Sequence, residues 1–249
     1  LYALQKSRAE GARRALVQAA TGIGKTYLAA FDAQNYKNVL FVAHREEILK
    51  QAAESFKNVR KSDDYGFFNA KEKCNDKSMI FASVASLGKE EFLNESVFPR
   101  DYFEYIVIDE CHHAVNDSYQ RIVNYFQPKF LLGLTATPER MDGKSILPYF
   151  NNRIAAEIRL PEAIDRKLLC PFQYFGVTDT VDLDHLKWAS GGYDKGELSR
   201  VYTLSGMTAN RRADLVVSSL LKYVTDIDDV KGLGFCVTVE HAEFMSNYF

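Results

Sequence analysis

The segment Ala20-Thr21-Gly22-Ile23-Gly24-Lys25-Thr26 decides the fold of this chain. It follows an apolar run at residues 15–17 and precedes a helix-compatible stretch at residues 27–31. A strand, a tight glycine turn and a helix N-terminus together form a phosphate cradle, because backbone N–H groups and the helix dipole converge on one anion. Lys25 is placed to reach the β- and γ-phosphates of a nucleotide, and the Thr26 hydroxyl to bind Mg²⁺. The usual pattern begins with a glycine, whereas this chain has Ala19 at that position.

The composition is that of an ordinary globular protein. Of the 249 residues, 47% are apolar and 26% are charged, and the net charge of −2 gives no global signal for nucleic acid. The four cysteines are far apart and lack metal-finger spacing: Cys74, Cys111, Cys170 and Cys236. We therefore expect free thiols that act as small buried apolar groups in a reducing, cytoplasmic setting. No apolar run approaches the length that a membrane span requires.

Short apolar runs recur along the first 135 residues and predict strands that are buried on both faces. These runs lie at residues 15–19, 39–43, 79–84, 105–109 and 130–135. Helical spacing separates them, for example at residues 46–57 and 117–125. The alternation predicts an α/β fold in which helices flank a doubly wound parallel sheet. Right-handed crossovers bring the carboxyl ends of all these strands, and with them the glycine-rich turn, to one edge.

An acidic pair, Asp109-Glu110, lies at the end of the run at residues 105–109. At the end of a strand, Asp109 can hold Mg²⁺ directly or through water. Glu110 can orient and deprotonate a water molecule that attacks the γ-phosphate. A solvated Asp-Glu turn is the plain alternative. The Cys111-His112-His113 stretch that comes next does not favour a metal site, since neighbouring positions rarely converge on one ion.

A second polar group, Thr135-Ala136-Thr137-Pro138, follows the last of the runs. Two hydroxyls on either side of an alanine, at a strand end, can hydrogen-bond the acidic residues. Through these hydrogen bonds, the two threonines can transmit whether the γ-phosphate is present or has been lost. A simple Thr-Pro turn is the alternative.

The pattern changes after residue 160. Residues 168–177 predict an extended, aromatic-rich connector, residues 207–225 a helix, residues 232–239 a buried strand and residues 240–249 the beginning of another helix. We therefore expect a first domain at residues 1–160, a connector at 161–205 and the start of a second, truncated α/β domain at 206–249.

The three motifs, in this order, resemble the first motor domain of superfamily 2 helicases and translocases. The form Asp-Glu-x-His at residues 109–112 is similar to the subgroup that contains the Res subunits of type III restriction enzymes. The stretch at residues 43–49 resembles motif Ia of that family, and residues 83–87 resemble the next motif that contacts the nucleic-acid backbone. Residues 232–241 resemble motif IV. The resemblance implies a RecA-like P-loop NTPase domain, followed by part of a second RecA-like domain.

The resemblance also implies a role for each site residue. The catalytic residues are Lys25, Asp109 and Glu110. The nucleotide is held by Thr21, Gly22, Ile23, Gly24, Lys25 and Thr26. The metal is held by Thr26 and Asp109. The residues that couple the nucleotide state to movement are His112, Thr135 and Thr137. The residues that contact nucleic acid are His44, Arg45, Ser83, Ser86 and Arg140.

The expected function is an ATP- and Mg²⁺-dependent motor that moves on or unwinds nucleic acid, DNA rather than RNA. Flanking nuclease or restriction-modification domains are the partners that family analogy implies. Motifs V and VI do not occur before Phe249, so this stretch by itself is expected to hydrolyse ATP weakly. Two other classes stay open: a nucleotide-gated binding module without motor activity, and a P-loop enzyme that acts on a small molecule. The Thr-Ala-Thr-Pro element weighs against the second of these.

Overall fold

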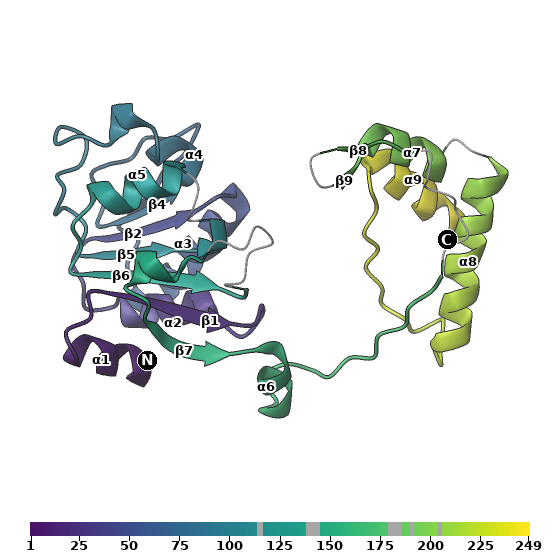
Figure 1. Cartoon of the computed structure of the whole chain (residues 1–249), viewed down its shortest axis with the longest axis horizontal. Helices are drawn as coiled ribbons and strands as arrows, with labels where there is room; N and C mark the ends of the chain where they lie inside the picture. The colour runs from purple at the N-terminus through teal and green to yellow at the C-terminus, as the bar shows by residue number, and fades with distance from the viewer. Residues whose placement is uncertain (114–116, 138–144, 179–185, 190–191, 204–205) are drawn as a thin grey trace. The chain divides into compact units, whose positions relative to one another are not determined.

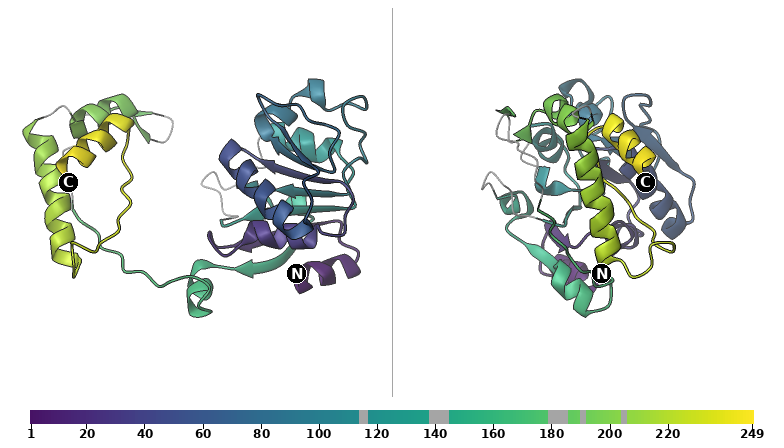
Figure 2. Two further views of the ribbon diagram at one scale, coloured as in Figure 1. Left: turned by 180° about the vertical axis from the view of Figure 1, so that it is seen from behind. Right: turned by 90° about the vertical axis from the view of Figure 1, so that its right-hand side faces the viewer.

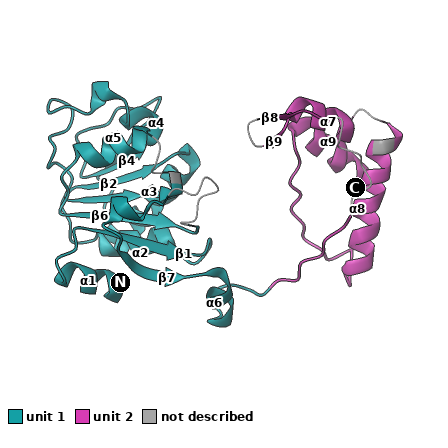
Figure 3. Cartoon of the chain, in the orientation of Figure 1, with its two compact units in different colours: residues 1–171 teal, residues 172–249 magenta. Residues whose placement is uncertain are grey.

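The computed structural model describes residues 1–113, 117–137, 145–178, 186–189, 192–203 and 206–249. The chain forms two compact units, residues 1–171 and residues 172–249 (Figure 3). All of the predicted site residues fall within residues 1–171.

The first unit is built on a seven-stranded sheet in the order β3-β4-β2-β5-β6-β1-β7, with every pairing parallel (Figure 1). The strands are β1 (Arg14–Ala19), β2 (Val39–Ala43), β3 (Tyr65–Phe68), β4 (Met79–Ser83), β5 (Tyr105–Ile108), β6 (Phe130–Thr135) and β7 (Ile154–Ile158). Since all seven run the same way, their carboxyl ends meet at one edge. This confirms the predicted α/β fold with a parallel sheet.

Helices cover both faces of this sheet (Figures 1 and 2). The α-helices of the first unit are α1 (Tyr2–Ala9), α2 (Lys25–Asp32), α3 (Glu46–Arg60), α4 (Val84–Leu87), α5 (Asp117–Tyr125) and α6 (Leu160–Asp165). Short 3₁₀ turns add η1 (Glu90–Phe92), η2 (Cys111–His113) and η3 (Leu147–Phe150). One core contains residues of α1, α2 and α3, and the other contains residues of α4, α5 and η3.

Side-chain alternation along each strand explains the two cores. In β1, Leu16 packs into the core under α4, α5 and η3, whereas Ala15 and Val17 pack into the core under α1, α2 and α3. Strands that are buried on both faces need apolar residues at nearly every position, which is why the continuous runs in the sequence predicted them. All five strands predicted in the first 135 residues lie within a residue of their predicted bounds: β1, β2, β4, β5 and β6.

Two strands were not predicted, and both lie at the edges of the sheet. β3 has Gly66 in the middle of four residues, and β7 contains exposed Ile154 and Glu157. An edge strand forms backbone bonds on one side only, so it needs fewer apolar residues than a central one. Their patterns were therefore too weak to be distinguished from loops.

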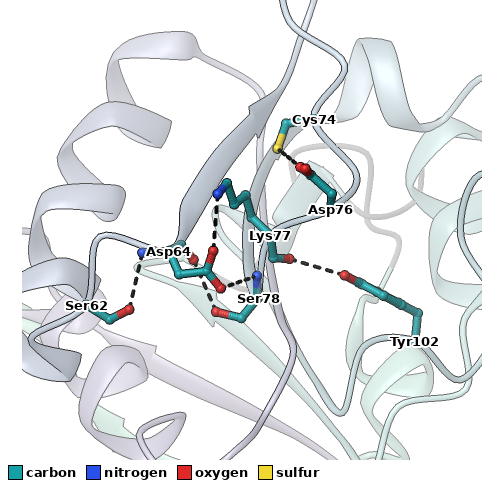
Figure 4. Close-up of polar contacts among 7 residues, drawn as sticks. All are labelled: Ser62, Asp64, Cys74, Asp76, Lys77, Ser78 and Tyr102. Carbon is teal, nitrogen blue, oxygen red and sulfur yellow. Dashed lines mark hydrogen bonds and ion pairs between the residues drawn. The ribbon is translucent and has the colours of Figure 1, made fainter.

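Polar contacts hold the segment that precedes β4 against the end of α3 and β3 (Figure 4). The Asp64 carboxylate accepts a hydrogen bond from the Ser78 N–H at 3.1 Å, and the Ser78 hydroxyl donates to the Asp64 carbonyl at 3.1 Å. These bonds to Ser78 lower the pKa of Asp64. The Tyr102 hydroxyl donates to the Lys77 carbonyl at 3.3 Å. Side-chain hydrogen bonds therefore stabilise this edge of the sheet, in addition to the backbone hydrogen bonds between β3 and β4.

The second unit contains helices α7 (Lys195–Thr203), α8 (Met207–Tyr223) and α9 (Val239–Tyr248) and the paired segments β8 (Trp188–Ala189) and β9 (Gly192–Tyr193). The predicted strand at residues 232–239 is wrong: residues 231–236 have no regular structure, and α9 begins at Val239. A strand needs a neighbour to pair its N–H and C=O groups. In the described part of residues 172–249, β8 and β9 are the only strands, and they pair with each other.

The boundary between the units also differs from the predicted one. The expected connector at residues 161–205 contains most of α6, which belongs to the first unit, and α7, which packs against α8 and α9 in the second. Residues 172–178 have no regular secondary structure, as expected of a connector.

The cysteines are free thiols, as predicted, but only Cys111 is fully buried, and Cys170 is exposed. Burial raises the pKa of the Cys111 thiol well above its usual value. Within the described residues, no helix combines the length and the apolar character that crossing a membrane demands.

Candidate nucleotide site

The glycine-rich loop connects β1 to α2 at the carboxyl edge of the sheet. Gly22 and Gly24 both have φ near +89°, in the left-handed region that favours glycine. Gly24 is the N-cap of α2, so the first N–H groups of the helix point out of the loop. A Cβ at Gly22 would lie 3.3 Å from Leu169 Cδ2, whereas one at Gly24 would meet no atom within 4 Å. Open backbone donors at a helix start can bind an anion, so the loop has the geometry that the predicted phosphate cradle requires.

Lys25, the first residue of α2, bends back over this loop. Its Nζ donates to the Ala19 carbonyl at 2.9 Å and to the Ala20 carbonyl at 3.3 Å. The ammonium group is therefore held at the mouth of the cradle by neutral acceptors. A phosphate oxygen is a stronger, charged acceptor, and the amine can exchange the carbonyls for it without a change in the backbone.

The acidic pair lies where β5 ends. Asp109 is only 7% exposed, and its N–H donates to the Val42 carbonyl of β2 at 2.9 Å. Burial, and then the neighbouring Glu110 charge, raise the pKa of Asp109 to about 6, while Lys25 opposes the shift. Lys25 and Asp109 thus interact across the sheet edge, although β6 separates their strands. A buried carboxylate with this environment is suited to a hard cation.

Glu110 has a positive φ of 46°, which is unusual for a residue with a side chain. Such a conformation costs about 1 kcal/mol or more and is concentrated at functional sites. The strained turn leads directly into η2, which brings His112 back beside Glu110. His112 Nδ1 lies 3.2 Å from Glu110 Oε2.

His112 also connects the acidic pair to Thr135, the last residue of β6, and to Thr137 just after it. Its Nδ1 lies 3.3 Å from the Thr135 hydroxyl oxygen. Thr135 is fully buried, donates to the Thr137 carbonyl at 3.1 Å and accepts from the Thr137 N–H at 3.2 Å. Because the Thr135 proton is directed to Thr137, a proton on Nδ1 is the arrangement that satisfies both neighbouring oxygens. Glu110, His112, Thr135 and Thr137 therefore form one continuous polar network.

The residues predicted to contact nucleic acid fall into different environments. His44 and Arg45 follow β2 and are exposed. Ser83 and Ser86 are only 7% and 6% exposed, and the Ser83 hydroxyl accepts the Ser86 N–H at 3.3 Å as the N-cap of α4. The structure thus gives Ser83 a capping role and does not turn these hydroxyls to solvent. Arg140 lies outside the described residues.

His44 lies beside the acidic pair, which the sequence did not indicate. Burial, Arg45 and His112 lower the pKa of His44, while the Glu110 charge raises it. The pairing of Val42 with Ile108 explains this, since the residues after β2 and β5 then leave the sheet side by side.

Two further polar residues at this edge did not stand out in the sequence. Gln18 is 2% exposed, and its Oε1 has no hydrogen-bond partner among the described residues. The Tyr119 hydroxyl of α5 is also buried without a partner there, and burial and the Asp109 charge raise its pKa well above the usual value. The one available signal was a polar Gln18 inside the otherwise apolar run at residues 15–19.

The fold and the site together define a class, the RecA-like P-loop domain with an acidic pair and a Thr-Ala-Thr segment at the carboxyl edge of its sheet. Residues 1–140 match the family model described as "Type III restriction enzyme, res subunit". The chain belongs to this family.

A relative from Escherichia coli, "Type I restriction enzyme EcoAI endonuclease subunit", is 29% identical over 261 residues. The match covers 94% of this chain but only 31% of that protein, so the chain spans about a third of the length of its relative.

Two solved structures share the fold. The Type ISP restriction-modification enzyme LlaGI, solved as a nuclease-deletion mutant in complex with a DNA substrate mimic, gives a TM-score of 0.51 at 12% identity, over 96% of this chain and 24% of that one. A hypothetical ATP-dependent RNA helicase from Sulfolobus tokodaii gives 0.51 at 18% identity, over 61% of this chain and 49% of that one. At these identities the similarity establishes the fold alone.

Proposed function

We propose that this chain is the ATP-binding part of a nucleic-acid motor, a helicase or translocase that moves on DNA. The observation that carries the proposal is the polar network at the carboxyl edge of the sheet. It joins the acid after β5 to the threonines at the end of β6 through His112, beside the glycine-rich loop after β1. A simple phosphate-binding enzyme needs the loop and the acids, but it does not need a buried link to a further loop.

The residues present fit a nucleotide with Mg²⁺. The loop from Thr21 to Gly24, with Ile23 between the two left-handed glycines, directs backbone donors to one place, and Lys25 lies over it. The described residues contain no group of three or more His, Cys, Asp or Glu side chains that could hold a metal. Mg²⁺ does not require one, because it commonly takes one or two protein oxygens and completes its shell with phosphate and water. Thr26 and Asp109 are the ligands we propose.

In hydrolysis, Glu110 takes a proton from the water that attacks the γ-phosphate. Its carboxylate is positioned by the strained backbone at Glu110 itself and by His112 Nδ1 at 3.2 Å. Lys25 and the backbone N–H groups of the loop stabilise charge on the phosphate oxygens. Bound Mg²⁺ supplies further neutralisation of that charge.

Coupling to movement follows from the same network. A change in charge at Glu110 alters the bond that His112 makes, and His112 shares the same nitrogen with Thr135. Thr135 in turn holds the backbone of Thr137, after which the chain leaves the sheet. A discrete change at the γ-phosphate can thus reposition the segment after β6.

DNA is proposed as the track because the EcoAI relative is a restriction enzyme subunit and the LlaGI structure holds a DNA substrate mimic. Arg45 is exposed and follows β2 at the carboxyl edge of the sheet, where its guanidinium group can contact a phosphate backbone. Contacts of this kind make binding salt-dependent and weakly sequence-specific. A neighbour described as an RNA helicase means that RNA has to be tested as well.

The decisive test is the variant Glu110→Gln in the natural protein that carries this chain. It removes the base but keeps the size of the side chain, so we expect ATP turnover to fall by at least about 100-fold with little change in nucleotide affinity. Turnover is measured by phosphate release and affinity with a fluorescent ATP analogue. Glu54→Gln, at an exposed position of α3, is the matched control. Turnover of Glu110→Gln at the parent rate would show that the base is another residue.

The same assay, run with duplex DNA, single-stranded DNA, RNA or no nucleic acid, tests the track. Strong stimulation by DNA supports the proposed motor. Stimulation by RNA alone contradicts the choice of DNA. Nucleotide binding without turnover in any condition identifies a gated binding module instead.

A further inference from the structure

Gln18 is a polar residue among the five buried residues of β1, and the other four are apolar. It is the fifth of the six residues of β1, Arg-Ala-Leu-Val-Gln-Ala, and it is 2% exposed. Its Oε1 accepts no hydrogen bond from any described residue. An acceptor that is buried in this way makes the folded state less stable than an acceptor that receives a hydrogen bond. An apolar residue at this position would avoid that cost, so the amide needs another explanation.

The register of the sheet places Gln18 beside Thr135. Gln18 pairs with Thr135 of β6 on one side and with Glu157 of β7 on the other. It shares the face of β1 with Leu16, under α5 and η3, because Val17 and Ala19 belong to the opposite core. In a parallel sheet, side chains at paired positions point to the same face from backbones about 4.8 Å apart. The Gln18 amide and the Thr135 hydroxyl are therefore neighbours.

Of the two neighbours in register, only Thr135 can supply a donor. Glu157 is a carboxylate held by Arg159 at 2.5 Å, and an ionised carboxylate only accepts hydrogen bonds. The Thr135 hydroxyl has one proton, which goes to the Thr137 carbonyl, while its oxygen faces the Thr137 N–H and His112 Nδ1. Thr135 is thus fully engaged in this state, and Gln18 is left without a donor.

We propose that Gln18 is a positioning residue that accepts a hydrogen bond from the Thr135–Thr137 segment in the nucleotide-bound state. In that state the Thr135 hydroxyl proton moves from the Thr137 carbonyl to Gln18 Oε1. This hydrogen bond stabilises only the nucleotide-bound state. It therefore increases the coupling between nucleotide binding and the response to DNA. The proposal rests on the function proposed above, because it requires that the network respond to nucleotide.

The test is Gln18→Met, which has nearly the same length but no amide. In the absence of nucleotide we expect its melting temperature to equal or exceed that of the parent, because the unpaired acceptor is gone. The further rise in melting temperature caused by a non-hydrolysable ATP analogue with Mg²⁺ should be smaller than in the parent. Stimulation of ATP turnover by DNA should fall by at least about fivefold, the lower end of typical coupling effects. Leu16→Met, on the same face of β1, is the matched control for packing.

A double-mutant cycle with Thr135→Val shows whether the two residues act together. We expect Gln18→Met to have no further effect on stimulation once the Thr135 hydroxyl is absent. Additive losses would overturn the assignment of Thr135 as the donor.

Two other outcomes would overturn the proposal. If Gln18→Met is less stable than the parent without nucleotide, the amide is already paired in that state. If it is equally stable and shows parental stimulation, the amide has no part in coupling. If the parent protein neither binds nor hydrolyses ATP, the proposed function itself is overturned. That result differs from every outcome for Gln18→Met, so failure of the proposed function can be distinguished from failure of the proposed role of Gln18.

Discussion

At the scale of single residues, the site combines burial with strain. Asp109 is almost fully buried beside a second carboxylate, and Glu110 has a left-handed backbone. Both features cost stability in the absence of a ligand. Proteins keep such residues where a bound group compensates, which is consistent with the proposed cation and phosphate at this edge.

The raised pKa of Asp109 predicts a specific pH dependence of stability. The folded protein binds this proton more tightly than the unfolded chain, so the contribution of Asp109 to stability falls as pH rises from about 4 to about 6 and then stays constant. A shift of about two pH units corresponds to about 3 kcal/mol. We therefore expect Asp109→Asn, without nucleotide or Mg²⁺, to increase the free energy of unfolding by up to about 3 kcal/mol at pH 7.5 and hardly at all at pH 4.

Urea denaturation at the two pH values measures this difference, and Asp101→Asn, at an exposed position, is the control. An equal effect of Asp109→Asn at both pH values would mean that burial does not raise this pKa.

At the scale of elements, α4 and α5 are packed backbone to backbone. A Cβ at Gly88, just after α4, would lie 2.7 Å from the Val84 carbonyl oxygen and 2.8 Å from the Ser118 carbonyl oxygen. Arg121 Nε donates to the Gly88 carbonyl at 2.7 Å. The end of α4 is thus fixed to the helix that begins after the acidic motif. Only a residue without a side chain allows this approach.

Gly88→Ala should therefore destabilise the first unit by about 2 kcal/mol, the usual cost of overpacking against atoms that cannot move away. A lower denaturation midpoint with an unchanged slope is the expected result. Gly232→Ala is the control, because a Cβ there meets no atom within 4 Å. Gly88→Ala with parental stability would indicate that α4 shifts freely relative to α5.

At the scale of the whole molecule, the first unit is self-contained. Both hydrophobic cores and all seven parallel strands lie within residues 1–171. A chain of this length buries enough apolar surface to fold without help. The described residues of the nucleotide site are all in this unit too.

A fragment of residues 1–171 should accordingly fold cooperatively, with coincident urea transitions by circular dichroism and fluorescence. We expect its denaturation midpoint to match that of the corresponding transition in the whole chain. Non-coincident transitions, or a fragment that does not fold, would show that residues 172–249 contribute to the stability of the first unit.

What the sequence by itself determined was local. Short stretches of sequence were enough to predict the central strands, the glycine turn, the acidic pair and the threonine pair. A strand that is buried on both faces must be apolar, and a phosphate loop must have glycine where φ is positive. The order of these stretches was sufficient to predict a parallel sheet with one functional edge. The strand predicted at residues 232–239 had an equally apolar pattern, yet the pattern alone did not provide a partner to pair with it.

Only the tertiary structure decided which side chains meet. His112 lies between Glu110 and Thr135, and Gln18 beside Thr135, because β5, β6 and β1 are neighbours in the sheet although they are far apart in the chain. Ser83 caps a helix instead of facing solvent for a similar reason, since β4 ends where α4 packs on α5. Contacts of this kind depend on strand order and register, and these are set by the packing of the whole sheet rather than by any single segment.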